Sequence, residues 1–177
     1  MGSGNNNNLT AAYSNRTAVL RVEGRGSFKT SPPLKQFIHQ VINTGSADRI
    51  LIEMSNCSGM DSTFMGVVAG IACYIKSKPA FSFKLINLSE KNKKLLVTLG
   101  VDRVVNYALC ASEEEQELLN ELNGSSRNLE AGVASKLDAA KTTLEAHEML
   151  VEINPDNLSK FKSVLEYLQD DVRNLSD

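Results

Sequence analysis

Residues Arg49 to Gly66 read Arg-Ile-Leu-Ile-Glu-Met-Ser-Asn-Cys-Ser-Gly-Met-Asp-Ser-Thr-Phe-Met-Gly, and the rest of the chain is arranged around them. This segment begins with an apolar run, Ile50 to Ile52, of the kind found in strands buried on both faces of a parallel sheet. The turn-forming residues 56–59 end that strand. Asp61 then stands where a carboxylate caps a helix by accepting a backbone N–H from the first turn. The segment therefore predicts a strand, a turn and a helix in direct succession.

The helix predicted after Asp61 carries two hydroxyl groups in its first turn, on Ser62 and Thr63, and it stops before Pro79. A helix N-terminus holds unpaired N–H donors and partial positive charge, so a phosphate is well tolerated there. A hydroxyl at this position can therefore be a regulatory switch, or it can be plain capping chemistry. The local pattern by itself favours capping.

Strand and helix patterns alternate along residues 9–122. The expected strands are 9–13, 17–23, 50–52, 82–87 and 103–107, and the expected helix caps are Thr30 or Ser31, Asp61, Ser89 and Ser112. Ser112 and Glu115 also have the spacing of a capping box. Alternation of this kind implies crossover connections, and hence an α/β fold with a mostly parallel sheet and helices packed on it. The first two strands form a hairpin, which gives that sheet an antiparallel edge.

The sequence changes character after residues 123–128, which read as a linker. Residues 129–175 carry two narrow apolar stripes with steps of three and four, separated by Asn154-Pro155. Because proline breaks a helix and the connection is short, these residues predict an antiparallel helical hairpin. The hairpin could close on itself, dock on the domain of residues 9–122, or form a homo-oligomer with a second copy.

The chain has two histidines, and both are expected to be structural. His39 falls on the solvated side of its predicted helix. His147 fills a gap in the first tail stripe, which starts at Val133; it is expected to pack there, although protonation on that seam could weaken pairing in acid. Neither histidine is near Ser62 or Cys57 in sequence, so no catalytic residue is predicted and the chain is not expected to be an enzyme.

The composition excludes several classes of protein. The net charge is −2 and the Lys and Arg residues are dispersed, so the basic patch of a nucleic-acid binder is absent from the sequence. No apolar run reaches the length of a membrane span, and no secretory leader is visible. Cys57, Cys73 and Cys110 are far apart and form no metal-binding pair. We therefore expect no metal, no cofactor, no nucleic-acid or membrane partner, and a reduced, cytoplasmic compartment.

Three segments together resemble the STAS family, the sulfate transporter and anti-sigma factor antagonist domains. They are Ile50-Leu51-Ile52, then Met60-Asp61-Ser62-Thr63-Phe64-Met65-Gly66, and Leu99-Gly100-Val101 ahead of the last expected strand. The family pattern is an apolar strand followed by Met-Asp-Ser-Ser/Thr-Gly-Leu-Gly at the start of a helix. The resemblance covers residues 9–122 in layout, and the helical tail lies outside it.

In the antagonist branch, this resemblance implies a phosphorylation switch. A serine kinase of the anti-sigma type phosphorylates the Ser after the Asp, the unmodified form binds that kinase and frees its sigma factor or other client, and a phosphatase restores the unmodified form. Ser62 matches the phosphorylated position, and Asp61, Ser62, Thr63 and Phe64 match the partner-binding segment. The resemblance thus implies a bacterial regulator of transcription. The switch also requires an exposed Ser62 hydroxyl, because a kinase must reach that oxygen.

Two departures from the family pattern matter. Phe64 stands where the family usually has Gly, and it is expected to place a bulky ring at the recognition surface. The family turn Gly-x-Leu-Asp is Gly24-Arg25-Gly26-Ser27 here, so the acidic residue is missing. The alternative function is a scaffold adaptor that does not switch, with a STAS-like core and an oligomerising tail. In that function Ser62 is only a residue of the capping region.

Overall fold

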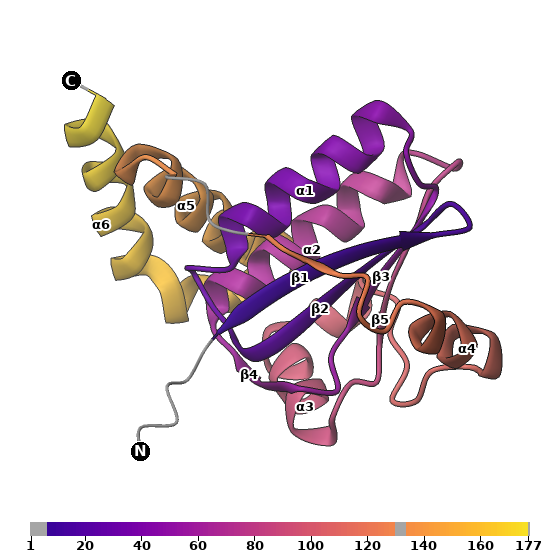
Figure 1. Cartoon of the computed structure of the whole chain (residues 1–177). Coiled ribbons are helices and arrows are strands. Elements are labelled where there is room, and N and C mark those ends of the chain that lie inside the picture. The colour runs from indigo at the N-terminus through magenta and orange to yellow at the C-terminus, as the bar shows by residue number, and fades with distance from the viewer. Residues whose placement is uncertain (1–6, 130–133, 177) are drawn as a thin grey trace, which may run out of the picture.

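A computed structural model of the chain describes residues 7–129 and 134–176. Figure 1 shows a sheet with helices around it, followed by two C-terminal helices. The strands are β1 (Asn8–Ser14), β2 (Thr17–Gly26), β3 (Arg49–Glu53), β4 (Cys57–Met60), β5 (Ser82–Ile86) and β6 (Arg127–Asn128). The helices are α1 (Ser31–Thr44), α2 (Ser62–Lys76), α3 (Glu90–Leu99), α4 (Glu113–Glu121), α5 (Lys136–Ile153) and α6 (Leu158–Ser176), with the 3-10 turns η1 (Val101–Arg103) and η2 (Pro155–Asn157). The predicted α/β fold with C-terminal helices is confirmed.

The sheet is mixed. Its strands run in the order β5-β3-β2-β1-β6, and β4 pairs with the end of β2. β1 and β2 form an antiparallel hairpin, joined by a turn in which Asn15 and Arg16 both have positive φ. That turn conformation matches the twist of the flanking strands. β2, β3 and β5 are parallel neighbours, so the predicted parallel sheet with an antiparallel edge is confirmed.

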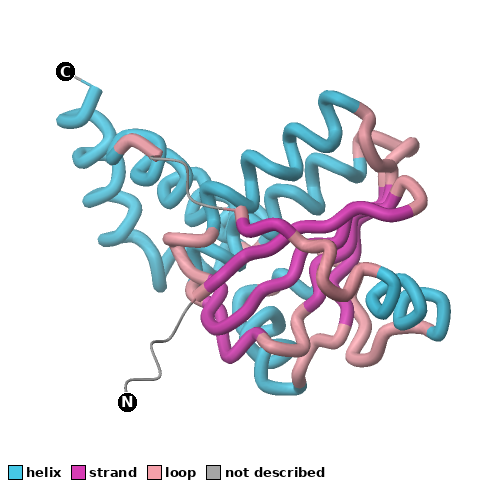
Figure 2. The backbone as a smooth tube through the Cα atoms, viewed as in Figure 1, coloured by secondary structure: helices cyan, strands magenta, loops and turns pink. Residues whose placement is uncertain are grey.

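Strand β3 is buried on both faces, as its sequence predicts. Ile50 and Ile52 belong to the main core, which the sheet forms with α1 and α2. Leu51 faces the other way and packs with Leu118 and Leu119 of α4. Figure 2 shows these two layers, with α1 and α2 on one side of the strands and α4 on the other. Because successive side chains of a strand point to opposite faces of the sheet, this one short strand contacts both helical layers.

Two short strands appear where the sequence predicts none. β4 forms within the expected turn of residues 56–59, because Met60 pairs in parallel with Gly26 at the end of β2. β6 lies at the end of the expected linker, residues 123–128, and pairs with β1. Both strands depend on a partner that is distant in sequence, so no local pattern reveals them.

The strand expected over residues 103–107 is wrong. The chain leaves α3 through η1, and the backbone N–H groups of Val104 and Val105 both donate to the carbonyl oxygen of Val101. Because these two N–H groups are already hydrogen-bonded in the turn, they cannot pair with a neighbouring strand. All that remains of the expected strand is an isolated bridge from Tyr107 to β5.

The two C-terminal helices form a hairpin that docks on the core. The predicted break at Pro155 is confirmed, because η2 starts there and separates α5 from α6. Ala146 and Leu150 of α5 are buried in the main core, and α5 packs against α2. Of the three arrangements that the sequence leaves open, the structure shows the second, in which the hairpin docks on the domain of residues 9–122. Residues 130–133, with Val133 of the predicted stripe, lie outside the described residues.

The turn of the hairpin is anchored to the end of α3. Asn157 in η2 is completely buried, and its side-chain amide donates to the carbonyl oxygens of Leu99 at 2.9 Å and Leu150 at 2.7 Å. Leu99 is the last residue of α3, so this one amide ties the hairpin turn to the core. A buried amide that satisfies two carbonyls fixes its surroundings, because losing it would leave both oxygens unpaired.

Candidate functional site

Asp61 fixes the start of α2, as the sequence predicts. One oxygen of its carboxylate accepts the N–H of Phe64 at 2.8 Å, which makes Asp61 the N-cap of α2. The other oxygen accepts the N–H of Phe28 at 2.8 Å, from the loop between β2 and α1. The backbone N–H of Asp61 in turn donates to the carbonyl of Gly26 at 2.9 Å. One acidic residue therefore holds the loop and the first turn of α2 together.

The expectation that Phe64 lies at a recognition surface is wrong. Its side chain is 0% exposed and belongs to the main core. The ring fits there because Gly26 has no side chain: a Cβ at Gly26 would lie 2.8 Å from Cδ1 of Phe64. The family pattern has Leu and Gly at these two positions, so in this chain the bulky group has moved from the turn to the helix. The two exchanges, Gly in place of Leu at position 26 and Phe in place of Gly at position 64, thus compensate each other in volume.

Ser62 is the first residue of α2, and its hydroxyl faces the C-terminal hairpin. Ser62 is half-buried, and its Oγ lies 2.9 Å from Nε2 of His147 in α5. The freely exposed hydroxyl that a kinase needs is therefore not found in this docked arrangement. Thr63, the next residue, is 4% exposed and points into the protein.

The protonation pattern of His147 follows from its neighbours. Nδ1 lies 2.7 Å from the carbonyl oxygen of Thr143, which can only accept, so Nδ1 carries the ring hydrogen. In the neutral ring Nε2 is then the acceptor, and the hydroxyl of Ser62 donates to it. The ring is 4% exposed and forms a T-shaped pair with Phe161 of α6, with 4.9 Å between ring centroids. His147 is packed, as predicted, but its partner on α2 is 85 residues away and cannot be found from local sequence.

Helices α2 and α5 approach each other unusually closely beside Ser62. A Cβ added at Gly66 would lie 2.2 Å from the carbonyl oxygen of Ala146, which is far shorter than any real contact. The backbones can touch here only because position 66 is glycine. One turn further along, a Cβ at Gly70 would make an ordinary contact with Met149, at 3.9 Å. At Gly66, but not at Gly70, the hairpin therefore packs directly against the backbone of α2.

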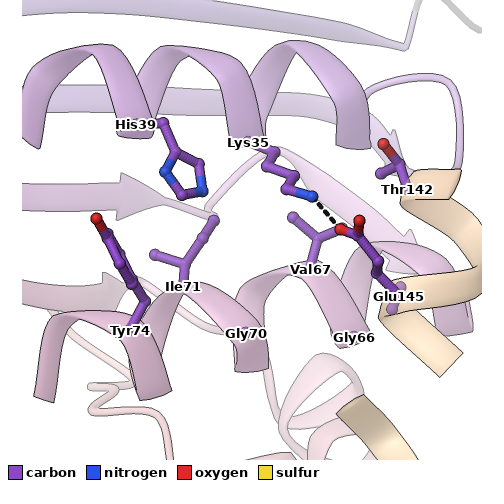
Figure 3. A pocket seen from close by; sticks show the side chains of 10 residues that line it. Lys35, His39, Gly66, Val67, Gly70, Ile71, Tyr74, Thr142 and Glu145 are labelled. Atoms are coloured by element: carbon purple, nitrogen blue, oxygen red, sulfur yellow. Dashed lines mark hydrogen bonds and ion pairs between the residues drawn. The ribbon is translucent and has the colours of Figure 1, made fainter. Parts of the chain in front are cut away.

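A cavity of about 190 Å³ lies at the junction of α1, α2 and α5, as Figure 3 shows. Lys35 of α1 forms an ion pair with Glu145 of α5 at one side of it. At the other side, His39 packs against Tyr74 with the two rings tilted and 5.1 Å between ring centroids. Burial, and then the nearby Lys35 ammonium, lower the pKa of His39, so this ring is neutral at physiological pH. Contrary to the sequence-based expectation, His39 is half-buried in this junction and is not on a solvated face.

A second group of charges anchors α4 and lies away from Ser62. Glu115 is 2% exposed and accepts hydrogen bonds from Lys84 at 2.8 Å, Arg49 at 3.2 Å and the backbone of Ser112 at 2.8 Å. Burial alone would raise the pKa of Glu115, but these donors and charges outweigh it and hold the pKa below its usual value. The capping box predicted for Ser112 and Glu115 is confirmed, and its role is structural.

The described residues provide little for a cofactor or a reactive cysteine. Burial raises the pKa of the Cys57 thiol, so this cysteine is a poor nucleophile. Within residues 7–129 and 134–176, no group of His, Cys, Asp and Glu is arranged to hold a metal ion. Over the same residues, none of the helices combines the length and apolar character needed to cross a membrane.

Comparisons with known proteins point to one family. Two solved structures show a related fold. An anti-sigma factor antagonist, SpoIIAA in its unphosphorylated form, is 22% identical, with a TM-score of 0.51 over 66% of this chain and 98% of its own. An anti-sigma factor antagonist from Mycobacterium paratuberculosis is 16% identical, with a TM-score of 0.52 over 70% of this chain and 99% of its own. A comparison with curated protein sequences finds no match. The profile of the STAS domain matches residues 8–116, well over half of the sequence, and the chain therefore belongs to the STAS domain family.

Proposed function

We propose that this chain is a phosphorylation-regulated protein-interaction domain, which binds an anti-sigma factor or serine-kinase-type protein while Ser62 is unmodified. A kinase of this type would phosphorylate Ser62, and a phosphatase would reverse the reaction. Such partners act in the bacterial cytoplasm, and we propose the same setting for this chain. The observation that carries the proposal is the position of Ser62 in the STAS domain: it directly follows a cap that Asp61 fixes on both sides, and its Oγ faces His147 of the hairpin.

The four proposed partner-binding residues divide into two pairs. Asp61 and Ser62 are partly exposed and can contact a partner directly. Thr63 and Phe64 are 4% and 0% exposed, so their contribution is to hold the first turn of α2 in place from below. A partner therefore meets a short, rigid surface at the start of α2.

The proposed effect of phosphorylation is electrostatic. A phosphate on Ser62 adds about −1.5 to −2 charges. It would stand beside the Asp61 carboxylate, which already uses the cap position of α2. At a closed interface the added charge has to be desolvated, and an unpaired charge in such a place costs about 2–5 kcal/mol of binding free energy. The domain stays folded, because the helix end tolerates the phosphate and such end effects are only about 1 kcal/mol.

The test is a titration with the native partner. Affinity capture from the bacterial source supplies candidate partners, and the purified partner is titrated by calorimetry against wild type, Ser62→Ala and Ser62→Asp. Ser58→Asp is the matched control, because Ser58 is exposed on neighbouring β4 and receives the same charge. We expect Ser62→Ala and Ser58→Asp to bind like wild type and Ser62→Asp to bind at least about 30-fold more weakly. Equal affinities for Ser62→Ala and Ser62→Asp would contradict the proposal.

The scaffold adaptor remains the second candidate, and one observation favours it. The docked hairpin covers the hydroxyl of Ser62 through His147, which is the arrangement expected if Ser62 is never modified. The two candidates differ in the native phosphorylation state. Mass spectrometry of the protein isolated from its own cells should find phosphoserine at position 62 for a switch, and only unmodified Ser62 for a scaffold.

The Ser62–His147 pair also has the separation of an activated nucleophile and its base, so an enzyme has to be considered. Two features argue against catalysis. The His147 ring is buried against Phe161, and the carboxylate of Asp61 stands at the helix end where an oxyanion would need donors. We propose that the chain is not an enzyme. A fluorophosphonate probe, which labels activated serines, should leave Ser62 unmodified, and stoichiometric labelling would contradict this.

A further inference from the structure

The hairpin of α5 and α6 covers one continuous face of α2. Ser62, Gly66 and Gly70 follow each other at steps of four residues, so they lie along one side of that helix. His147 contacts Ser62, and Ala146 would collide with any side chain at position 66. The face that the hairpin occupies is thus the face that carries the proposed phosphorylation site.

We propose that docking of the hairpin and phosphorylation of Ser62 exclude each other, so that the hairpin acts as a gate over the hydroxyl of Ser62. This inference rests on the proposed function of Ser62. A kinase cannot reach Oγ while the hairpin is docked, and the hairpin cannot return once the phosphate is present. By linkage, the free energy by which the phosphate disfavours docking equals the free energy by which docking disfavours the phosphorylated state.

The exclusion follows from the contact itself. The 2.9 Å between Oγ and Nε2 holds a single hydrogen atom. Phosphorylation transfers the γ-phosphoryl group of ATP to Oγ: the new O–P bond forms as the bond to ADP breaks, and the hydroxyl hydrogen leaves as a proton. The donor to Nε2 is then gone, and a phosphorus with three oxygens has to fit where the ring stands.

The His147 ring cannot move aside within the docked hairpin. Its Nδ1 donates to the carbonyl oxygen of Thr143, and the ring is packed against Phe161 of α6. Relief therefore requires that α5 and α6 leave together. The Asn157 amide is bonded to α3 and is independent of Ser62, so the released hairpin remains tied at its turn.

Two glycines on the same face provide a matched pair of variants. Gly66→Ala places a Cβ 2.2 Å from a backbone oxygen of α5 and has to push the hairpin away. Gly70→Ala makes only ordinary contacts of 3.9 and 4.0 Å with the flexible Met149 side chain. Both changes give α2 the same gain in helix propensity, so any difference between them comes from the docking contact.

The experiment uses the full-length chain with phosphoserine incorporated at position 62 during translation, beside wild type, Gly66→Ala and Gly70→Ala. Hydrogen exchange of the α5 amides reports docking. The NMR signal of the His147 ring, one of only two histidines, reports its contact with Phe161. We expect phosphoserine and Gly66→Ala each to speed exchange in α5 by roughly tenfold or more and to shift the His147 signal, while Gly70→Ala matches wild type and β3 stays protected.

Two results would overturn the inference. If phosphoserine at 62 leaves α5 as protected as in wild type, or more protected, while Gly66→Ala exposes it, the hairpin docks but does not respond to Ser62. If neither change exposes α5, the docked contact itself is wrong. In both cases the proposed function is judged separately, because the calorimetric comparison of Ser62→Asp with Ser62→Ala reads out partner binding and not hairpin docking.

Discussion

The exchange of volume between Gly26 and Phe64 can be tested with a double-mutant cycle. Phe64→Ala removes a completely buried ring and leaves a cavity, which typically costs about 3–5 kcal/mol of unfolding free energy. Gly26→Leu overpacks the same space, because its Cβ alone would lie 2.8 Å from the Phe64 ring, and overpacking costs about 1–3 kcal/mol. The backbone of Gly26 is outside the left-handed region, so φ does not oppose the new side chain.

The double variant Gly26→Leu/Phe64→Ala restores the family's arrangement, with the bulky group on the turn and a small residue on the helix. The leucine then fills the cavity, and the two changes should cost about 1–3 kcal/mol less together than the sum of their separate costs. Urea unfolding followed by far-ultraviolet circular dichroism gives all four free energies of unfolding. Additive costs would show that the two residues do not share one space, and the proposed compensation would be refuted.

Three further predictions concern charge, thiols and assembly. Glu115→Gln should destabilise the domain by about 1–3 kcal/mol at neutral pH, measured by urea unfolding. Because the folded pKa of Glu115 is lowered, its contribution is complete above the unfolded value of 4.5 and is lost as the pH falls through the folded pKa, so the variant should lose less stability in acid than wild type. Iodoacetamide should modify exposed Cys110 first and buried Cys57 last, as peptide mass spectrometry can follow. Light scattering should give a monomer of 19.3 kDa, because Ala146, Leu150 and Leu168 of the tail are buried within the chain, and a dimer would show that exposed tail residues such as Leu158 and Leu175 pair between copies.

The parts of the fold that depend on neighbouring residues could be predicted from the sequence. Asp61 caps α2, and Ser112 with Glu115 forms a capping box. Both could be predicted because each pattern is complete within four residues. The apolar run of β3 likewise predicts its burial on both faces. β4 and β6 could not be predicted, because the strands that they pair with are distant in the sequence.

The candidate site was predictable only in part, for the same reason. The sequence places Ser62 in the first turn of α2, and the structure has it there. It gives no sign that His147 meets this serine, because the contact depends on how the hairpin docks. The burial of Phe64 was also missed, although one signal was present: a large residue replaces the family's Gly at 64 while a Gly replaces its Leu at 26.

The central claim is that the phosphorylation state of Ser62 controls partner binding. Its most direct test is the Kd of the captured native partner for the full chain with phosphoserine at 62, compared by calorimetry with the unmodified chain. The account predicts a Kd at least about 30-fold higher for the phosphorylated chain. Equal dissociation constants for the two forms would contradict it.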